Sequence, residues 1–266
     1  MNSKTFYDTH KNFALRTILD YYISPGTRCK YDILRKKLEK ANHFPNALDL
    51  GCSGNSFLLF TYDDQHKSFL DIAEQPLTYY LKLREKFLES QNRAHLNYHP
   101  INADISHLPY RSRSFDLISA LDVLEHSRDD LSVINEISRI LKNKGYLILT
   151  IPHQMKYFDE QDKIIGHYRR YELPQLRKIF FEHGYNIIRV FGVYGQLFKI
   201  SKVQKYDPGQ IEENIISLRT LYQSSSLFRN VWKVIVKIIA LFMRFDARFQ
   251  PIDRILNIGL VLQKEE

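Results

Sequence analysis

Short apolar runs alternate with helical patterns from Asn46 to about Asn186, and this alternation limits the fold more than any other feature of the chain. The runs have the length of buried strands, and the segments between them carry apolar residues at helical spacing. Strands that alternate with helices build βαβ units, in which the strands lie parallel in one sheet. The sequence therefore predicts an α/β fold around a parallel sheet.

Six strand-like runs fall within this region, and a seventh lies near the end of the chain. We expect strands at 47–51, 68–72, 96–102, 114–121, 146–152, 186–194 and 258–263. Helices are expected between them at 75–90, 129–145 and 172–184, and the last two end on a glycine, as helix ends prefer. The run at 258–263 is expected to return beside the sixth strand.

The pattern divides the chain into four parts. A helical extension, two helices broken at residues 24–26, is expected to occupy 1–45, ahead of the core at 46–194. Residues 195–256 are mostly helical and interrupt the alternation, so they are interpreted as a cap or insertion, not as an independent domain. The last strand of the core sheet then lies within 257–266.

Composition excludes some classes of protein and leaves others open. With 266 residues, 44% hydrophobic and 26% charged, the chain can bury a core and is neither disordered nor a multi-span membrane protein. Its two cysteines, Cys29 and Cys52, predict neither a disulfide scaffold nor a metal site. The first residues lack the features of a secretory signal, so a cytoplasmic protein is expected. The net charge of +8 favours an anionic partner without choosing one.

The first predicted strand runs directly into two glycines, Gly51 and Gly54. A buried strand that ends in Gly-x-x-Gly and leads into a helix makes a tight turn, with exposed backbone N–H groups and room for a ligand. A pyrophosphate cradle would require Gly-x-Gly-x-x-Gly, which is absent here. The turn therefore predicts a nucleotide-type pocket with no phosphate at this point.

Acidic residues follow the next strands at the same edge of the sheet. Asp71 stands twenty residues after Gly51, where a carboxylate can accept both hydroxyls of a ribose. Asp104 follows the third strand and Asp122 the fourth, at the carboxyl edge where open α/β folds bind ligands. Asp71 could instead cap the next helix, and Asp104 could be a turn residue only.

Several motifs stand in a fixed order: LDLGCSGN at 48–55, the strand end at Asp71, NADISHLPYRSRSFDLI at 102–118, ALDVLEH at 120–126 and YLILTIPH at 146–153. As a set they resemble the class I S-adenosylmethionine-dependent methyltransferases, in the small-molecule group that opens with LDxGC. The resemblance covers residues 46–190. It implies a Rossmann-like, seven-stranded, mostly parallel sheet with helices on both faces and an antiparallel last strand. It also implies S-adenosyl-L-methionine as the cofactor.

The resemblance implies a role for residues at each strand end. Asp49 and Gly51, with Cys52 and Ser53, correspond to the methionine end of the cofactor pocket. Asp71, with Ile72, corresponds to the ribose contact, and Asp104, with Ile105, corresponds to the adenine contact. Leu121 and Asp122 correspond to the pocket lining. Ser53 and Asn55 stand where the family more often has glycine.

Methyl transfer is an in-line displacement, so the protein has to align a nucleophile and remove its proton where it has one. The reaction requires no metal. His126 and His167 are the candidate bases at this edge, ahead of His153, although each could be an ordinary loop histidine. The segment GHYRRY at 166–171 also resembles family members, and Arg169, Arg170 and Tyr171 are expected to bind the substrate. The alternative for the two arginines is solvated charge on a loop.

A strongly basic amphipathic helix is predicted at 226–249. Its basic residues gather on one side, and apolar residues fill the rest: Trp232, Ile235, Ile239, Phe242 and Phe245. Its apolar core is too short to span a membrane. Residues 227–249 either lie in a membrane interface or pack their apolar face on the protein, which is the more common outcome.

The leading hypothesis is a methyltransferase that acts on a small-molecule or lipid-linked acceptor. An RNA methyltransferase is favoured by the positive charge, but ALDVLEH at 120–126 is unlike the Pro-Pro-aromatic turn of base amino-methylating enzymes, and no RNA-binding module is present. A non-catalytic cofactor-binding or membrane-docking protein on the same fold is a third hypothesis. The expected location is cytoplasmic, with peripheral membrane contact as the open alternative. The sequence predicts no oligomeric state.

Overall fold

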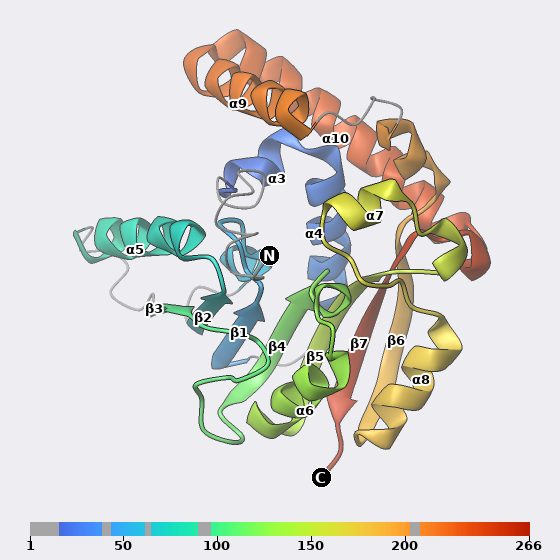
Figure 1. The fold of residues 1–266 in the computed structure, drawn as a ribbon. Coiled ribbons are helices and arrows are strands. Elements are labelled where there is room, and N and C mark those ends of the chain that lie inside the picture. The colour runs from blue at the N-terminus through green and yellow to red at the C-terminus, as the bar shows by residue number, and fades with distance from the viewer. Residues whose placement is uncertain (1–15, 39–43, 62–64, 90–96, 203–207) are drawn as a thin grey trace.

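The computed structural model describes residues 16–38, 44–61, 65–89, 97–202 and 208–266. These residues form one seven-stranded sheet in the order β3-β2-β1-β4-β5-β7-β6 (Figure 1). The strands are β1 Asn46–Leu50, β2 His66–Asp71, β3 Tyr98–Asn102, β4 Phe115–Leu121, β5 Leu141–Pro152, β6 Tyr185–Tyr194 and β7 Asn257–Lys264. Strands β1 to β5 pair in parallel, whereas β7 is antiparallel to both β5 and β6. The predicted fold class is confirmed.

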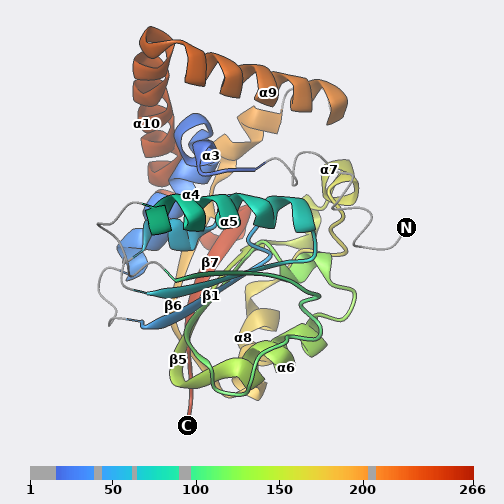
Figure 2. The same cartoon turned by 90° about the vertical axis from the view of Figure 1, so that its left-hand side faces the viewer.

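Helices cover both faces of the sheet (Figure 2). On one face lie α4 Pro25–Leu38, α5 Glu74–Glu89 and α10 Ser226–Phe249, and on the other lie α6 Asp130–Ile140 and α8 Leu173–Glu182. The apolar side chains of the sheet pack into two buried clusters, one under each helical layer. The alternation in the sequence therefore reflects a three-layer core.

The helix predicted at 129–145 ends earlier than expected. Asp129 caps α6 by accepting from the backbone N–H of Ser132, but the helix stops at Ile140. Leu141 is already extended, since it pairs with Phe115 in the sheet. The glycine that suggested a helix end therefore lies inside β5, and the strand begins five residues before the predicted one.

Within residues 16–38, two helices precede the core where the sequence predicts them. α3 Leu19–Ile23 and α4 are separated at Ser24, which is extended, and Pro25 opens α4. Proline suits this position because it has no N–H to leave unpaired. α3 lies above the carboxyl edge of the sheet, and α4 runs down from there onto one face (Figure 1). Residues 1–15 and 39–43 of the predicted extension lie outside the described part.

The expected helical insertion stands between β6 and β7. It contains η4 Gln196–Lys202, α9 Pro208–Ser224, α10 and η5 Ile252–Arg254. Other short helices are η1 Phe57–Phe60, η2 Leu124–His126, η3 Met155–Tyr157 and α7 Glu160–Ile164. No helix in the described ranges combines the length and apolar composition needed to cross a bilayer.

The packing favoured for α10 is found only in part. The helix contacts α4 and β6 through a narrow seam of Val236, Ala240, Met243 and Ala247. Most of the apolar face expected to pack instead points to the outside, and the side chains of Ile235, Ile239, Phe242 and Phe245 are exposed. At Ala247 the helix comes so close to β6 that a Cβ on Gly192 would lie 2.3 Å from the backbone oxygen of Ala247. The bulky residues are left on the outer side.

Candidate functional site

A cavity of about 1300 Å³ lies at the carboxyl edge of the sheet, beneath the N-terminal helices and the helical insertion. All ten residues predicted to bind a cofactor line it, and so do His126, His167 and Arg170. The ten are Asp49, Gly51, Cys52, Ser53, Asp71, Ile72, Asp104, Ile105, Leu121 and Asp122. Arg169 and Tyr171 are not part of the lining. The strand order explains this result, because β3, β2, β1 and β4 are neighbours and their ends meet.

The glycine turn after β1 makes room for the chain itself. Gly51 has φ +61°, and a Cβ there would lie 2.8 Å from Cγ2 of Val123. At Gly54 a Cβ would lie 1.7 Å from the backbone oxygen of Arg16. Backbone of the N-terminal segment thus crosses the turn where the sequence suggested a close approach by a ligand.

Asp71 connects the end of β2 to this turn. Its Oδ2 accepts from the backbone N–H of Ser53 at 2.8 Å, and its Oδ1 accepts from that of Ala73 at 2.9 Å. Burial raises the pKa of the carboxyl. Each oxygen has lone pairs beyond these single bonds, so the carboxylate can still accept from two hydroxyls of a ligand. Asp71 does not occupy the N-cap position of α5, which begins at Glu74, and its turn contacts are compatible with a ribose role.

Asp49 lies deeper in the cavity wall. The hydroxyls of Ser56 and Ser119 both donate to its carboxylate. Burial nevertheless raises the pKa of Asp49 to about 6. A buried carboxyl with this pKa changes charge near neutral pH, so a cationic ligand beside it would favour the ionised form.

Asp104 has the turn role that the sequence left open. Its Oδ1 accepts from both the backbone N–H and the hydroxyl of Ser106, each at 2.8 Å. Ile105 beside it is half-buried against the core and also lines the cavity. The pair supplies one apolar and one acidic group at the end of β3.

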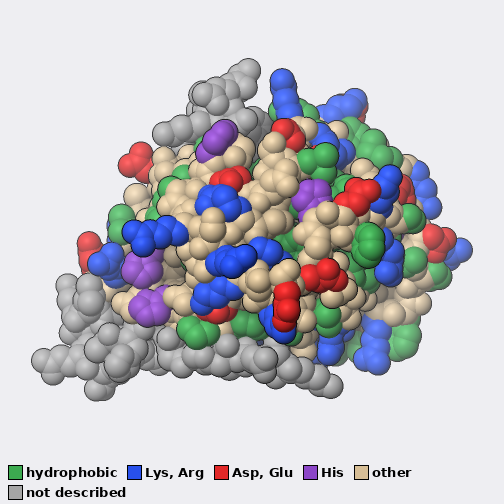
Figure 3. All heavy atoms as spheres, turned by 90° about the horizontal axis from the view of Figure 1, so that it is seen from below, with side chains coloured by type: hydrophobic (Ala, Val, Ile, Leu, Met, Phe, Trp, Pro, Cys, Tyr) green, Lys and Arg blue, Asp and Glu red, His purple; other side chains and the backbone are tan. Residues whose placement is uncertain are grey.

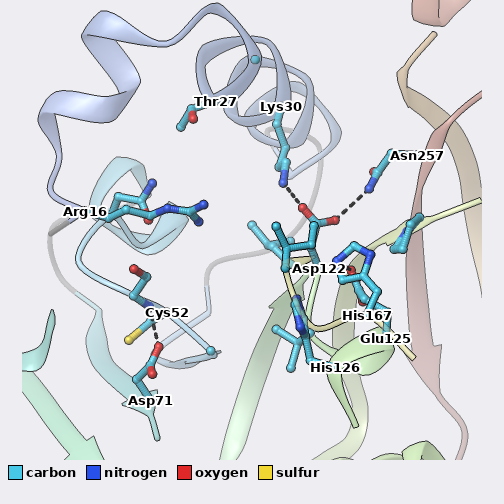
Figure 4. A pocket seen from close by; sticks show the side chains of 18 of the residues that line it. Arg16, Thr27, Lys30, Cys52, Asp71, Asp122, Glu125, His126, His167 and Asn257 are labelled. Carbon is cyan, nitrogen blue, oxygen red and sulfur yellow. Dashed lines mark hydrogen bonds and ion pairs between the residues drawn. The ribbon is translucent and has the colours of Figure 1, made fainter. Parts of the chain in front are cut away.

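Asp122 is paired on both of its carboxylate oxygens. Its Oδ1 accepts from Thr150 Oγ1 and from Asn257 Nδ2, both at 2.8 Å, and its Oδ2 forms an ion pair with Lys30 (Figure 4). Burial acts to raise the pKa of Asp122, but the Lys30 ammonium outweighs it and lowers that pKa to about 2. Asp122 is therefore ionised at neutral pH.

Sequence reasoning missed Lys30 and Asn257. They come from α4 and β7, which are 92 and 135 residues away from Asp122 in the chain. Asn257 opens a strand that was predicted, but no local pattern marks it or Lys30 as part of a site. Only the assembled fold brings them together.

Three titratable residues meet on the opposite side of the cavity from Asp71 (Figure 4). Glu125 is fully buried, and its Oε1 lies 3.8 Å from Nε2 of His167. The His126 and His167 rings meet edge to face with centroids 4.6 Å apart. Burial, with Asp122 nearby, raises the pKa of Glu125 well above its usual value, and burial with His167 lowers that of His126 to about 3. His126 is therefore a neutral imidazole at neutral pH.

The GHYRRY segment is held mainly by internal pairs. Arg170 is buried, and its guanidinium bonds to Asp162 Oδ2 at 2.8 and 2.9 Å. Arg169 pairs with Asp130 at 3.0 Å, and the buried Tyr171 donates its hydroxyl to the same carboxylate at 2.7 Å. The substrate roles expected of Arg169 and Tyr171 are not supported, because Asp130 occupies both side chains outside the cavity. Arg170 does reach the lining.

The cavity is acidic although the chain is basic. Its lining has eight carboxyl side chains and five basic ones: Asp20, Asp49, Asp71, Asp104, Asp122, Glu125, Asp129 and Asp162 against Arg16, Lys30, Arg128, Arg170 and Arg219. On the face seen from below, basic and acidic side chains are mixed (Figure 3). Such a cavity favours a ligand with positive charge. The sulfonium and ammonium of S-adenosylmethionine, together with a ribose near Asp71, fit this donor and acceptor set.

Comparison with known proteins agrees with this chemistry. Residues 48–149 match the family model described as a methyltransferase domain. The protein MJ0638 of Methanocaldococcus jannaschii is 34% identical over 171 residues, which are 64% of this chain and 68% of that protein. A Mycobacterium tuberculosis relative, named as an S-adenosylmethionine-dependent methyltransferase, is 23% identical over 96 residues, 35% of each chain.

The fold has solved counterparts. Phosphoethanolamine N-methyltransferase 2 of Haemonchus contortus, in complex with S-adenosyl-L-methionine, aligns with a TM-score of 0.64 at 17% identity. The alignment covers all of this chain and 60% of that one. Motifs, fold, cavity and relatives agree on one assignment: the chain belongs to the class I S-adenosylmethionine-dependent methyltransferases and is an enzyme that uses this cofactor.

Proposed function

We propose that this methyltransferase acts at a lipid surface, on an amphiphilic or lipid-linked small-molecule acceptor. When bound, S-adenosylmethionine supplies an electrophilic methyl group. In this proposal Asp71 accepts from its ribose, Asp104 and Ile105 hold the adenine, and the carboxylate of Asp49 faces the cationic methionine end. The single observation that supports the lipid surface is the outer side of α10.

The outer side of α10 carries a continuous apolar stripe. Nine exposed residues fall within an arc of about 120° at 100° per residue: Leu227, Val231, Val234, Ile235, Ile238, Leu241, Phe242, Phe245 and Phe249. The side chains of Phe242 and Phe249 are 61% and 72% exposed. The stripe lies opposite the seam that packs on the protein. An apolar surface of this length favours an apolar environment over water.

Basic residues flank the stripe on one side. Lys237 and Arg248 are exposed and Lys233 is half-exposed, and on the helical wheel all three lie between the packed seam and the stripe. An amphipathic helix with an apolar face and a basic flank binds in the plane of a membrane interface that contains anionic lipids. The chain's net charge of +8 adds attraction of the same sign. We therefore commit to an anionic lipid surface as the partner of α10.

The same helical insertion contributes to the cavity wall. Trp232 of α10 lines the cavity, and its indole N–H donates to the backbone oxygen of Ile23 at 3.1 Å. Leu218 and Arg219 of α9 also line it, and Arg219 bonds to Asp20 at 2.8 Å. The helix that binds the lipid surface is thus also part of the cavity wall. An acceptor anchored in that surface would lie next to the cavity.

The proton of the acceptor has two candidate bases. His126 and His167 lie across the cavity from Asp71. The low pKa of His126 makes it a weak base, so His167 is the stronger candidate of the two. An RNA acceptor is less favoured, because the excess of carboxylates in the lining repels a phosphate backbone.

The test is co-sedimentation of the full chain with vesicles of phosphatidylcholine mixed with phosphatidylglycerol. Phe242→Glu combined with Phe249→Glu is expected to lower partitioning at least about tenfold, because two large apolar side chains lose their burial in lipid. The matched control is Phe181→Glu on α8, whose side chain is 79% exposed but lies on the other face of the sheet.

The control variant should bind vesicles like the wild type. Equal loss in both variants, or no binding by the wild type, would contradict the proposal. Analytical ultracentrifugation tests the alternative that a second copy of the chain, not lipid, packs on the stripe. A wild-type dimer that dissociates in the α10 variant would mean that a second copy covers this surface in place of lipid.

A further inference from the structure

We propose that Glu125, His126 and His167 form a binding site for a divalent transition-metal ion in the cavity wall. The three residues offer two imidazole nitrogens and one carboxylate oxygen, and these ligand atoms all lie within 4.8 Å of one another. Glu125 and His126 come from η2, and His167 comes from the GHYRRY segment 41 residues after His126. Two imidazoles and a carboxylate are a donor set that Zn²⁺, Fe²⁺ and related ions accept.

Glu125 is the residue that most needs a partner. Its side chain is fully buried, and neither carboxylate oxygen has a hydrogen-bond donor. A buried carboxylate without a donor or counter-charge is costly, and structures normally pair it or use it to bind a metal. The facing group is the imidazole of His167, at 3.8 Å, and a cation between them would satisfy both.

His167 is already oriented as a ligand. Its Nδ1 lies 2.7 Å from Asp162 Oδ1, which directs Nε2 toward Glu125. Arg170 in turn holds Asp162 through Oδ2 at 2.8 Å. Metal-binding histidines commonly bond a carboxylate through the nitrogen that does not bind the metal, which fixes their tautomer and their direction.

The distances suit an ion after a small contraction. Metal–nitrogen and metal–oxygen bonds are about 2.1 Å long, so two ligands of one ion lie at most about 4.2 Å apart. The 3.8 Å between Glu125 and His167 is within this limit, and the ligand atoms of all three residues lie within 4.8 Å of one another. An ion bound by all three residues would draw these atoms together.

Three protein ligands leave coordination positions open on the cavity side. The role of those positions follows from the proposed function and depends on it. With the ion bound, His126 and His167 would be its ligands and no longer bases. The ion itself would bind an oxygen of the acceptor and lower the pKa of a hydroxyl, whose proton leaves to water. The acceptor class this favours is one with a hydroxyl or phosphate oxygen at the reacting end. Methyl transfer itself needs no metal, so the ion would act by positioning and acidifying the acceptor.

The test is metal binding by the full chain, stripped with chelator, without acceptor. Titration with Co²⁺ is expected to give visible d–d absorption at one equivalent per chain, and Zn²⁺ is expected to displace it. Glu125→Gln keeps the size of the side chain and is expected to weaken Co²⁺ binding at least tenfold. His167→Gln is expected to do the same, and circular dichroism checks that both variants fold.

The matched control is a histidine pair outside the cavity. The rings of His66 and His99 are stacked with centroids 6.1 Å apart, so they could capture a metal at the surface. His66→Gln combined with His99→Gln should leave the absorption unchanged. The proposal is overturned if the wild type binds no Co²⁺, if Glu125→Gln and His167→Gln bind it like the wild type, or if only the His66/His99 variant loses it.

Binding of S-adenosylhomocysteine, measured in parallel, separates this inference from the proposed function. Glu125→Gln is expected to bind S-adenosylhomocysteine like the wild type, because Glu125 is across the cavity from Asp71. A wild type that binds Co²⁺ but not S-adenosylhomocysteine would contradict the cofactor assignment and keep the metal site. A wild type that binds S-adenosylhomocysteine but not Co²⁺ would contradict the metal site and keep the cofactor assignment.

Discussion

The two sides of the cavity are built in different ways. The side around Asp71 comes from the ends of β1, β2, β3 and β4, which are neighbours in the sheet and close in the chain. The opposite side collects Lys30, Trp232 and Asn257 from α4, α10 and β7. The first side depends on strand order and short motifs, and the second depends on how added helices pack over the sheet. We expect cofactor binding to depend on the first side and acceptor choice on the second.

The ion pair between Lys30 and Asp122 joins the two sides, so breaking it should have the largest effect. Lys30→Met leaves a buried carboxylate without its counter-charge, since the side chains are only 13% and 28% exposed. We expect the free energy of unfolding to fall by about 3 kcal/mol. Urea denaturation followed by circular dichroism measures this loss.

The matched control is Lys142→Met, which removes the partner of Asp116 at the other end of the sheet. That pair has a more exposed lysine, so its loss should cost at most about 1 kcal/mol. Equal stability losses in the two variants would mean that the Lys30 pair does not tie the N-terminal helices to the core more firmly than a surface pair.

A smaller effect is expected on the cofactor side of the cavity, where ligand affinity should depend on pH. The folded-state pKa of Asp49 is about 6, above its usual 3.8, because burial disfavours the charge. The folded chain therefore holds the extra proton between these values, and the stability contributed by Asp49 falls as pH rises through this window. A cationic ligand needs the ionised form, so affinity should rise with pH.

At pH 5 only about a tenth of Asp49 is ionised, so the apparent dissociation constant of S-adenosylmethionine, which carries the cationic sulfonium, should be about tenfold higher than at pH 7. Calorimetric titration at several pH values measures this. Asp49→Asn cannot ionise and should remove the pH dependence. If Asp49→Asn keeps the wild-type pH dependence of affinity, another group is responsible for it and Asp49 does not contact the ligand.

The difference between the two sides also explains what the sequence could predict. Strand ends in a parallel sheet meet at one edge whatever the rest of the chain does, so Asp71, Asp104 and Asp122 were predicted from their positions after strands. Asp49 lies inside the first strand, and its place in the pocket was implied by the family resemblance. The early end of α6 was missed, because pairing of Leu141 in the sheet overrides the lysine and glycine pattern of a helix end.

The acceptor side was less predictable because its contacts are long-range. Nothing near Lys30 or Asn257 marks them as partners of Asp122. The amphipathic pattern of α10 was clear, but the pattern could not tell which side would pack, and in the fold the side that carries Ala240 and Ala247 packs on the protein. For the same reason Arg169 and Tyr171, predicted as substrate ligands, are instead paired with Asp130.

The central claim is that the carboxyl edge of the sheet binds S-adenosylmethionine through Asp71. The most direct test is calorimetric titration of S-adenosylhomocysteine into the wild type, Asp71→Ala and Asp129→Asn, with thermal melting to verify folding. Asp129 is an exposed carboxyl group of the same cavity that caps α6, so it serves as the control. The account predicts that the wild type and Asp129→Asn bind alike, and that Asp71→Ala binds ten- to a hundredfold more weakly, about the value of hydrogen bonds to a charged group. No binding by the wild type, or unchanged affinity in a folded Asp71→Ala variant, would contradict it.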